Sequence, residues 1–194
     1  MRTKISAIYP EQLEKASTHT NPELHIVDFT LSTSSQRGVE CLHEKPEGVE
    51  SFLIVNESNL PILFVPFDKN TFVDDARNSL KQCECFLSPE EYQAGDWRMF
   101  VETKYCQKRN NHGKILEAAK QLKNTLSYYR EQQIIEDAEI VHLFVSLPNE
   151  DENPFRGWWY SQDEISEVRF TYKAILVGTN RVVVKNSKSL IYED

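Results

Sequence analysis

The sequence predicts an α/β protein built on a mixed β-sheet. Short apolar runs separated by polar, turn-forming residues occupy 51–66 and 82–106 and are typical of strands. A long amphipathic segment, 112–133, comes next and is followed by a nearly continuous apolar run, 139–147. A strand, a helix and a buried strand in that order predict a βαβ crossover, which adds parallel pairing to an otherwise antiparallel sheet.

The N-terminal third predicts few regular elements. Residues 9–17 favour a short helix with Pro10 in its first turn. Residues 24–31 alternate weakly between polar and apolar positions and indicate a strand. The segment 30–48 is rich in Ser, Thr, Gly and charge, so it is expected to be mostly loop.

Four antiparallel strands are expected in the middle of the chain. The apolar runs 51–56 and 61–66 are separated by a short polar stretch, which predicts a hairpin. The runs 82–87 and 97–105 flank a second turn-forming stretch and are expected to pair with each other. The strand near 139–147 should lie parallel to one of these four.

The helix near 112–133 has the clearest pattern in the sequence. Its apolar side chains recur at steps of four and three and therefore form one stripe. The members of this stripe are Ile115, Ala119, Leu122, Leu126 and Tyr129. After 147, residues 167–177 alternate like a strand, 178–181 indicate a hairpin turn into 182–185, and the last residues resemble a frayed tail.

Composition limits the class of protein. The chain has 194 residues, 40% hydrophobic and 27% charged, which suits a single domain over 1–194 with its core near 50–147. No apolar run is long enough for a membrane span or a secretory signal, so a cytoplasmic protein with no membrane partner is expected. The formal charge of −8 argues against a sequence-blind nucleic-acid binder, although a local basic groove can coexist with it.

The cysteines predict no zinc site. Cys83 and Cys85 form one spaced pair, but a structural zinc site usually needs a second pair and none exists. All four cysteines, which also include Cys41 and Cys106, are expected to be reduced. Because side chains alternate along a strand, Cys83 and Cys85 should be buried on the face opposite Glu84.

The segment 82–106 carries the candidate chemistry. Glu102 and Lys104 point to the same face of their strand, and an antiparallel partner strand can bring Glu84 beside them. Two carboxylates and an ammonium group would then converge, with polar ends open to solvent and at least one raised carboxylate pKa. Such a pair can hold Mg²⁺ or Mn²⁺, and the lysine can stabilise charge during phosphodiester cleavage.

These residues resemble the PD-(D/E)XK superfamily of restriction-endonuclease-like nucleases. The Glu-x-Lys element is Glu102-Thr-Lys104, the acidic residue of the preceding strand is Glu84, and a helical glutamine found in some branches matches Gln121. The resemblance covers about residues 50–147 and implies an α/β fold with an αβββαβ core flanked by helices. It also implies a metal-dependent nuclease that uses Mg²⁺ or Mn²⁺ and has DNA as its partner. The acidic residue that many members carry on the first helix would be Glu11 or Glu14.

Two other functional hypotheses stay open. The family usually has Asp at the position of Glu84, so the chain could have kept the fold and lost the activity, acting through a protein partner or a second copy of itself. An α/β protein unrelated to nucleases is the third reading. In both cases Glu102 and Lys104 would be only a salt pair on a half-exposed strand.

Several further residues have a structural and a functional interpretation. His142 lies in a buried strand and is interpreted as a core histidine rather than a ligand. Asp68 and Asp75 are expected in a solvated loop but could approach the site. The aromatic run 155–160 could stack on bases, yet it favours a loop anchor or an interface because no basic residues surround it.

Overall fold

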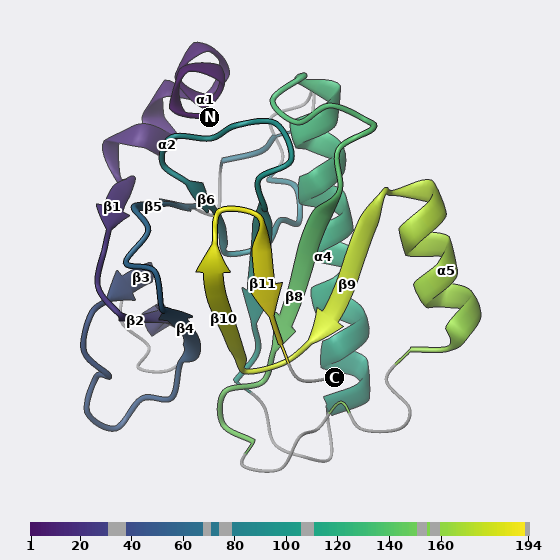
Figure 1. Ribbon diagram of the computed structural model, residues 1–194. Helices are drawn as coiled ribbons and strands as arrows, with labels where there is room; N and C mark the ends of the chain where they lie inside the picture. The colour runs from purple at the N-terminus through teal and green to yellow at the C-terminus, as the bar shows by residue number, and fades with distance from the viewer. Residues whose placement is uncertain are drawn as a thin grey trace.

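The computed structural model describes residues 1–30, 38–67, 71–73, 79–105, 111–150, 155 and 160–192. Over these ranges the chain is an α/β protein with two mixed β-sheets and four helices. Figure 1 shows the helices α4 and α5 beside the strands β8 and β9, and the helices α1 and α2 near the N-terminus. The predicted α/β class is therefore confirmed, whereas the second sheet was not predicted.

The first sheet contains the strands in which the candidate residues lie. Its order is β1 (Ser17–His19), β5 (Ile62–Pro66), β6 (Cys85–Pro89), β7 (Met99–Thr103), β8 (Val141–Ser146) and β9 (Ala174–Gly178). Pairing is antiparallel from β1 to β7 and parallel from β7 to β9. Helix α4 (Asn111–Glu131) connects β7 to the parallel strand β8, which confirms the predicted βαβ crossover.

The second sheet packs against the first. Its order is β11 (Ser189–Ile191), β10 (Arg181–Asn186), β4 (Phe52–Asn56), β2 (Glu23–Asp28) and β3 (Val39–Leu42). Strands β4 and β10 are parallel, and the other neighbours are antiparallel. Strand β2 confirms the strand predicted near 24–31, while β3 lies where loop was expected and β11 where a frayed tail was expected.

The remaining helices are short or exposed. They are α1 (Arg2–Ile8), α2 (Pro10–Glu14) and α5 (Gln162–Thr171). Helix α2 confirms the prediction near 9–17, with Pro10 as its first residue. Helix α1 was not predicted.

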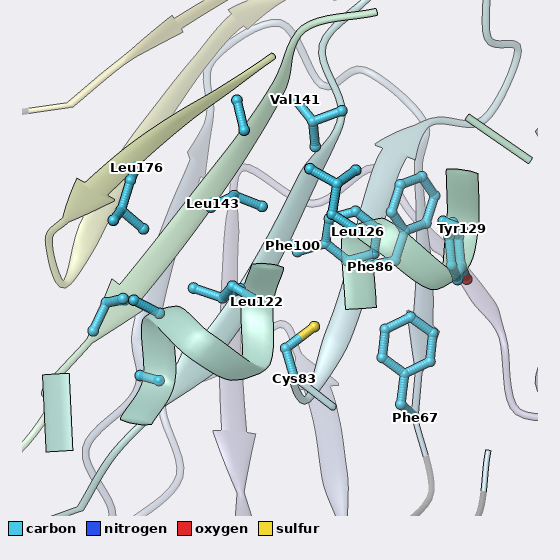
Figure 2. Packing of buried hydrophobic residues seen from close by; sticks show 14 of the residues in the cluster. Phe67, Cys83, Phe86, Phe100, Leu122, Leu126, Tyr129, Val141, Leu143 and Leu176 are labelled. Carbon is cyan, nitrogen blue, oxygen red and sulfur yellow. The ribbon is translucent and has the colours of Figure 1, made fainter. Parts of the chain in front are cut away.

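The core is divided into two main clusters by the first sheet. The apolar stripe of α4 is fully buried, as predicted, against one face of this sheet. Figure 2 shows Leu122, Leu126 and Tyr129 close to Phe86 and Phe100. The other face packs against the second sheet, so the described helices cover one face only and the expectation of a sheet flanked by helices holds in part.

The hairpin predicted for 51–56 and 61–66 is wrong. Strand β4 lies in the second sheet and β5 in the first, although both bury side chains in the core between the sheets. The side-chain amide of Asn56 donates to the carbonyl of Leu60 at 2.9 Å and accepts from its N–H at 3.0 Å. These bonds stabilise a short loop that passes from one sheet to the other instead of a ladder turn.

Two C-terminal predictions hold only in part. The strand predicted for 167–177 begins only at Ala174, as β9, because the capping box of Ser161 and Glu164 starts helix α5, which overrides the alternating pattern up to Thr171. The strand predicted for 182–185 is present within β10. Residues 178–181 do not close a hairpin, since β9 and β10 belong to different sheets. Phe155 is buried against Gly178, where an added Cβ would come within 2.3 Å of its ring. The described part of the aromatic run thus anchors a loop, and residues 156–159 lie outside the described ranges.

Candidate functional site

The candidate residues meet where the ladder between β6 and β7 opens. The last strand pair is Cys85 with Val101, and the N–H of Glu84 still donates to the carbonyl of Val101 at 3.2 Å. Extending this register by one residue places Glu84 opposite Glu102. The antiparallel pairing predicted from the sequence therefore brings the two glutamates to the same end of the sheet.

Lys104 joins β7 to helix α4. Its ammonium nitrogen lies 2.5 Å from Oε1 of Glu102 and donates to Oε1 of Gln121 at 2.7 Å. Gln121 in turn donates through Nε2 to the carbonyl of Gln82 at 2.7 Å. Gln121 thus lies at the site, as expected, and ties α4 to the segment that leads into β6.

Glu84 is held by a residue that the sequence reasoning missed. Its Oε2 accepts hydrogen bonds from both the backbone N–H (3.1 Å) and the hydroxyl of Thr103. The carboxylate thereby occupies the place where the ladder would have continued and satisfies a backbone donor that the opening leaves free. Thr103 is the unspecified residue of Glu-x-Lys, and nothing in its spacing suggested a role.

Each glutamate has one bound and one unbound oxygen. Within the described ranges, Oε1 of Glu84 and Oε2 of Glu102 are buried and have no hydrogen-bond partner. Buried polar atoms usually have a partner, and leaving a charged one without it is costly. A cation held by Glu84 and Glu102 would supply such a partner.

The site is closed rather than open to solvent, which contradicts the sequence-based expectation. Glu84, Glu102 and Lys104 are 8%, 1% and 9% exposed. Lys104 is covered by Gln121 of α4, and the second sheet, absent from the prediction, lies behind the first. The reading of Glu102 and Lys104 as a half-exposed salt pair is wrong for the same reason, because the pair is buried.

Burial dominates the electrostatics. It raises the pKa of Glu84 well above its ordinary value, with a further contribution from the charge of Glu102. Burial also raises the pKa of Glu102, to about 7, although the ammonium group of Lys104 opposes this shift. Burial lowers the pKa of Lys104, but Glu102, Glu84 and Glu117 together raise it more, so the net shift is upward and the lysine stays cationic.

A third carboxylate, Asp28, lies near the pair and was also missed. It ends strand β2 of the second sheet and is only 7% exposed. Its charge helps to raise the pKa of both Glu84 and Glu102. Sequence spacing could not reveal it, because β2 reaches the site through sheet packing.

The donor set suits a hard cation with incomplete protein coordination. Among the described residues, no group of three or more His, Cys, Asp or Glu side chains is arranged to hold a metal ion. Two carboxylates that complete their coordination with water and phosphate oxygens are nevertheless a common arrangement for Mg²⁺. The two unpartnered oxygens of Glu84 and Glu102 fit this arrangement.

The cysteines agree with the expectation only in part. Cys41, Cys83 and Cys85 are free, and Cys85 is buried between the sheets as predicted. Cys83 is buried on the helix side instead, where its N–H donates to Oγ1 of Thr125 at 2.8 Å. Regular alternation of side chains begins only at Cys85, the first residue of β6. Cys83 precedes the strand, so alternation does not determine its face. Cys106 lies outside the described residues.

The other candidates have no demonstrated place in the site. The ring of His142 stacks on Phe144, with centroids 6.1 Å apart. Glu11 and Glu14 lie on α2, which packs on β5. Asp68 and Asp75 fall outside the described ranges.

The metal-free protein should lose stability as the pH rises from about 4.5 to about 7. Glu102 has a pKa of about 7 in the folded state against 4.5 when unperturbed, so the folded state binds more protons in this window. The contribution of Glu102 is full below the window, is lost above it and is worth roughly 3 kcal/mol. Urea denaturation in a chelator across this range should show the fall, and Glu102→Gln should make it shallower, while Glu84, whose pKa burial also raises, keeps part of it. A Gln variant that keeps the wild-type slope would contradict the assignment.

No protein-family model, curated protein or solved structure matches the chain. None of the described helices combines the length and apolar character that crossing a membrane requires. The function is therefore inferred from the chemistry of the site.

Proposed function

We propose that this protein hydrolyses phosphodiester bonds in DNA with Mg²⁺ or Mn²⁺ held by Glu84 and Glu102. The observation that carries the proposal is the pair of buried, unpartnered carboxylate oxygens beside the cationic Lys104. Two carboxylates provide the oxygen ligands that these cations prefer. A neighbouring ammonium group stabilises negative charge that develops on a phosphate.

The order of elements supports the same proposal. Helices α1 and α2 precede the antiparallel strands β5, β6 and β7, which are followed by α4 and the parallel strand β8. Strands β1 to β4 lie between α2 and β5, and the order from β5 to β8 is compatible with the αβββαβ core of the restriction-endonuclease-like nucleases that Glu102-Thr-Lys104 resembles. Glu102 lies on β7, Lys104 directly follows β7, Glu84 directly precedes β6, and Gln121 lies on α4.

Each residue has a distinct role in the proposed reaction. Glu84 and Glu102 bind the cation, which would lower the pKa of a bound water and neutralise charge on the phosphate. The water oxygen would bond to phosphorus as one ester phosphorus–oxygen bond breaks, and the proton that the water loses would end on the leaving oxygen. Lys104, cationic at neutral pH, stabilises the charge on the phosphate oxygens, and Gln121 keeps its ammonium group in place.

Nicking of supercoiled plasmid DNA in Mn²⁺ tests the proposal. The wild type should nick, and Lys104→Ala should lower the rate at least about 100-fold, because one positioned charge typically contributes that much. The matched control is Lys185→Ala, which removes an exposed lysine of β10 paired with Glu57 and should leave the rate unchanged. No nicking by the wild type in either Mn²⁺ or Mg²⁺, or equal nicking by Lys104→Ala, would overturn the proposed activity.

The closed site favours one second candidate, a nuclease-like fold that binds another protein and no longer cleaves DNA. All three charged residues are at most 9% exposed, and Lys104 is already engaged by Glu102. Glutamate in place of the usual aspartate at position 84 points the same way. A wild type that binds Mn²⁺ but nicks no DNA would favour this candidate.

A further inference from the structure

We propose that Thr103 is a positioning residue whose hydroxyl orients the Glu84 carboxylate so that its free oxygen faces the cation. This inference rests on the proposed function, because it concerns the same metal site. Thr103 is completely buried in the last position of β7. It touches neither the cation nor the substrate and would act through Glu84.

The two hydrogen bonds of Thr103 act on one oxygen only. The backbone N–H and the side-chain hydroxyl both end on Oε2 of Glu84, while Oε1 has no partner among the described residues. Two donors at one oxygen restrain the last side-chain torsion of the glutamate. The free oxygen is therefore presented in one direction instead of rotating.

Glutamate needs this restraint more than aspartate would. Its side chain has an additional torsion, and ordering it costs more conformational entropy. The site uses Glu84 where the resembled family usually has aspartate, so a second donor beyond the backbone N–H offsets the added freedom. On the other glutamate, Lys104 binds Oε1 of Glu102 and leaves Oε2 free, which gives the same arrangement of one bound and one free oxygen.

The role belongs to the hydroxyl and not to the shape of the side chain. The hydroxyl of Thr103 reaches the proposed metal site through its hydrogen bond to Glu84, and the Thr103 side chain also hydrogen-bonds that of Tyr105. Valine has nearly the same shape as threonine and suits a strand, but it lacks the hydroxyl. Serine keeps the hydroxyl and lacks the methyl group. The two substitutions therefore separate positioning from packing.

Calorimetric titration of Mn²⁺ into the wild type, Thr103→Val and Thr103→Ser tests the proposal. Thr103→Val should raise the Kd about 10-fold or more, the usual effect of removing a group that orients a metal ligand, whereas Thr103→Ser should stay within about threefold of the wild type. Thermal unfolding in a chelator, run in parallel, shows that each variant is folded. A purely structural role predicts the reverse order, with serine more damaging than valine.

The outcomes are distinguishable. A Thr103→Val protein that binds Mn²⁺ as tightly as the wild type overturns the positioning role while leaving the metal site intact. Equal losses in the valine and serine variants also overturn it, because the hydroxyl would then make no difference. Absence of any Mn²⁺ heat for the folded wild type overturns the proposed metal site and this inference together.

Discussion

Replacing Glu139 with glutamine should lower the free energy of unfolding by about 3–5 kcal/mol, because it leaves a buried guanidinium group without its counter-charge. Arg98 is only 2% exposed, and its Nη1 donates to Oε2 of Glu139. Tyr92 donates to the other carboxylate oxygen at 2.6 Å, and its ring lies 4.7 Å below the guanidinium carbon. Urea denaturation at pH 7 measures the loss.

The control for this prediction is an exposed ion pair of the same chemistry. Glu57 and Lys185 have side chains that are 44% and 40% exposed, so Glu57→Gln should cost less than about 1 kcal/mol. Similar losses for Glu139→Gln and Glu57→Gln would show that the buried pair contributes no more than a surface pair.

Local patterns predicted the elements that a single stretch of chain determines. The stripe of α4 follows from helical spacing alone, and its five apolar members are all buried. The strand β8 follows from a continuous apolar run, since a central parallel strand is buried on both faces. Both predictions needed no knowledge of distant partners.

The second sheet could not be predicted in this way. Alternation along β4 shows that one face is buried, but not whether its partner is β5, β2 or β10. The strands that pair with β4 are β2 and β10, which are distant from it in sequence. A hydrogen bond from the side chain of Asn56 to Leu60 stabilises the loop between β4 and β5 in place of the expected hairpin turn. The same limitation explains the wrong hairpin between β9 and β10.

The residues of the candidate site also differ in whether local sequence could predict them. Glu102 and Lys104 share a face by spacing, and antiparallel pairing with the next strand brings in Glu84, so these three could be predicted together. Asp28 and Thr103 could not be predicted. Asp28 belongs to the second sheet, and Thr103 contacts Glu84 only because the ladder between β6 and β7 opens there. The burial of the site also depends on packing and was wrongly predicted as exposure.

Metal binding at Glu84 and Glu102 should stabilise the folded protein. A cation that binds only the folded state adds RT ln(1 + [M]/Kd), about 2.7 kcal/mol at a hundredfold excess over Kd. It would also offset the burial cost and the repulsion that raise the pKa of both carboxyl groups. Neutral glutamines at both positions keep the side-chain size but remove the charge that attracts the cation. The double variant Glu84→Gln, Glu102→Gln should therefore lose the site completely.

Two controls separate loss of the metal ligands from loss of the Lys104 ion pair and from the change in net charge. The double variant leaves Lys104 buried without its carboxylate partner, so the single variant Glu84→Gln, which keeps the pair of Glu102 and Lys104, is measured beside it. The exposed pair Glu44→Gln, Glu47→Gln changes the net charge by the same amount away from the site and should bind like the wild type.

Calorimetric titration of Mn²⁺ into these proteins tests the metal site most directly. The wild type and the Glu44→Gln, Glu47→Gln control should give a saturable heat for one site, Glu84→Gln should bind at least tenfold more weakly, and the double variant should give only the heat of dilution. Equal heats for the wild type and the double variant, both folded, would contradict the assignment of Glu84 and Glu102 as metal ligands.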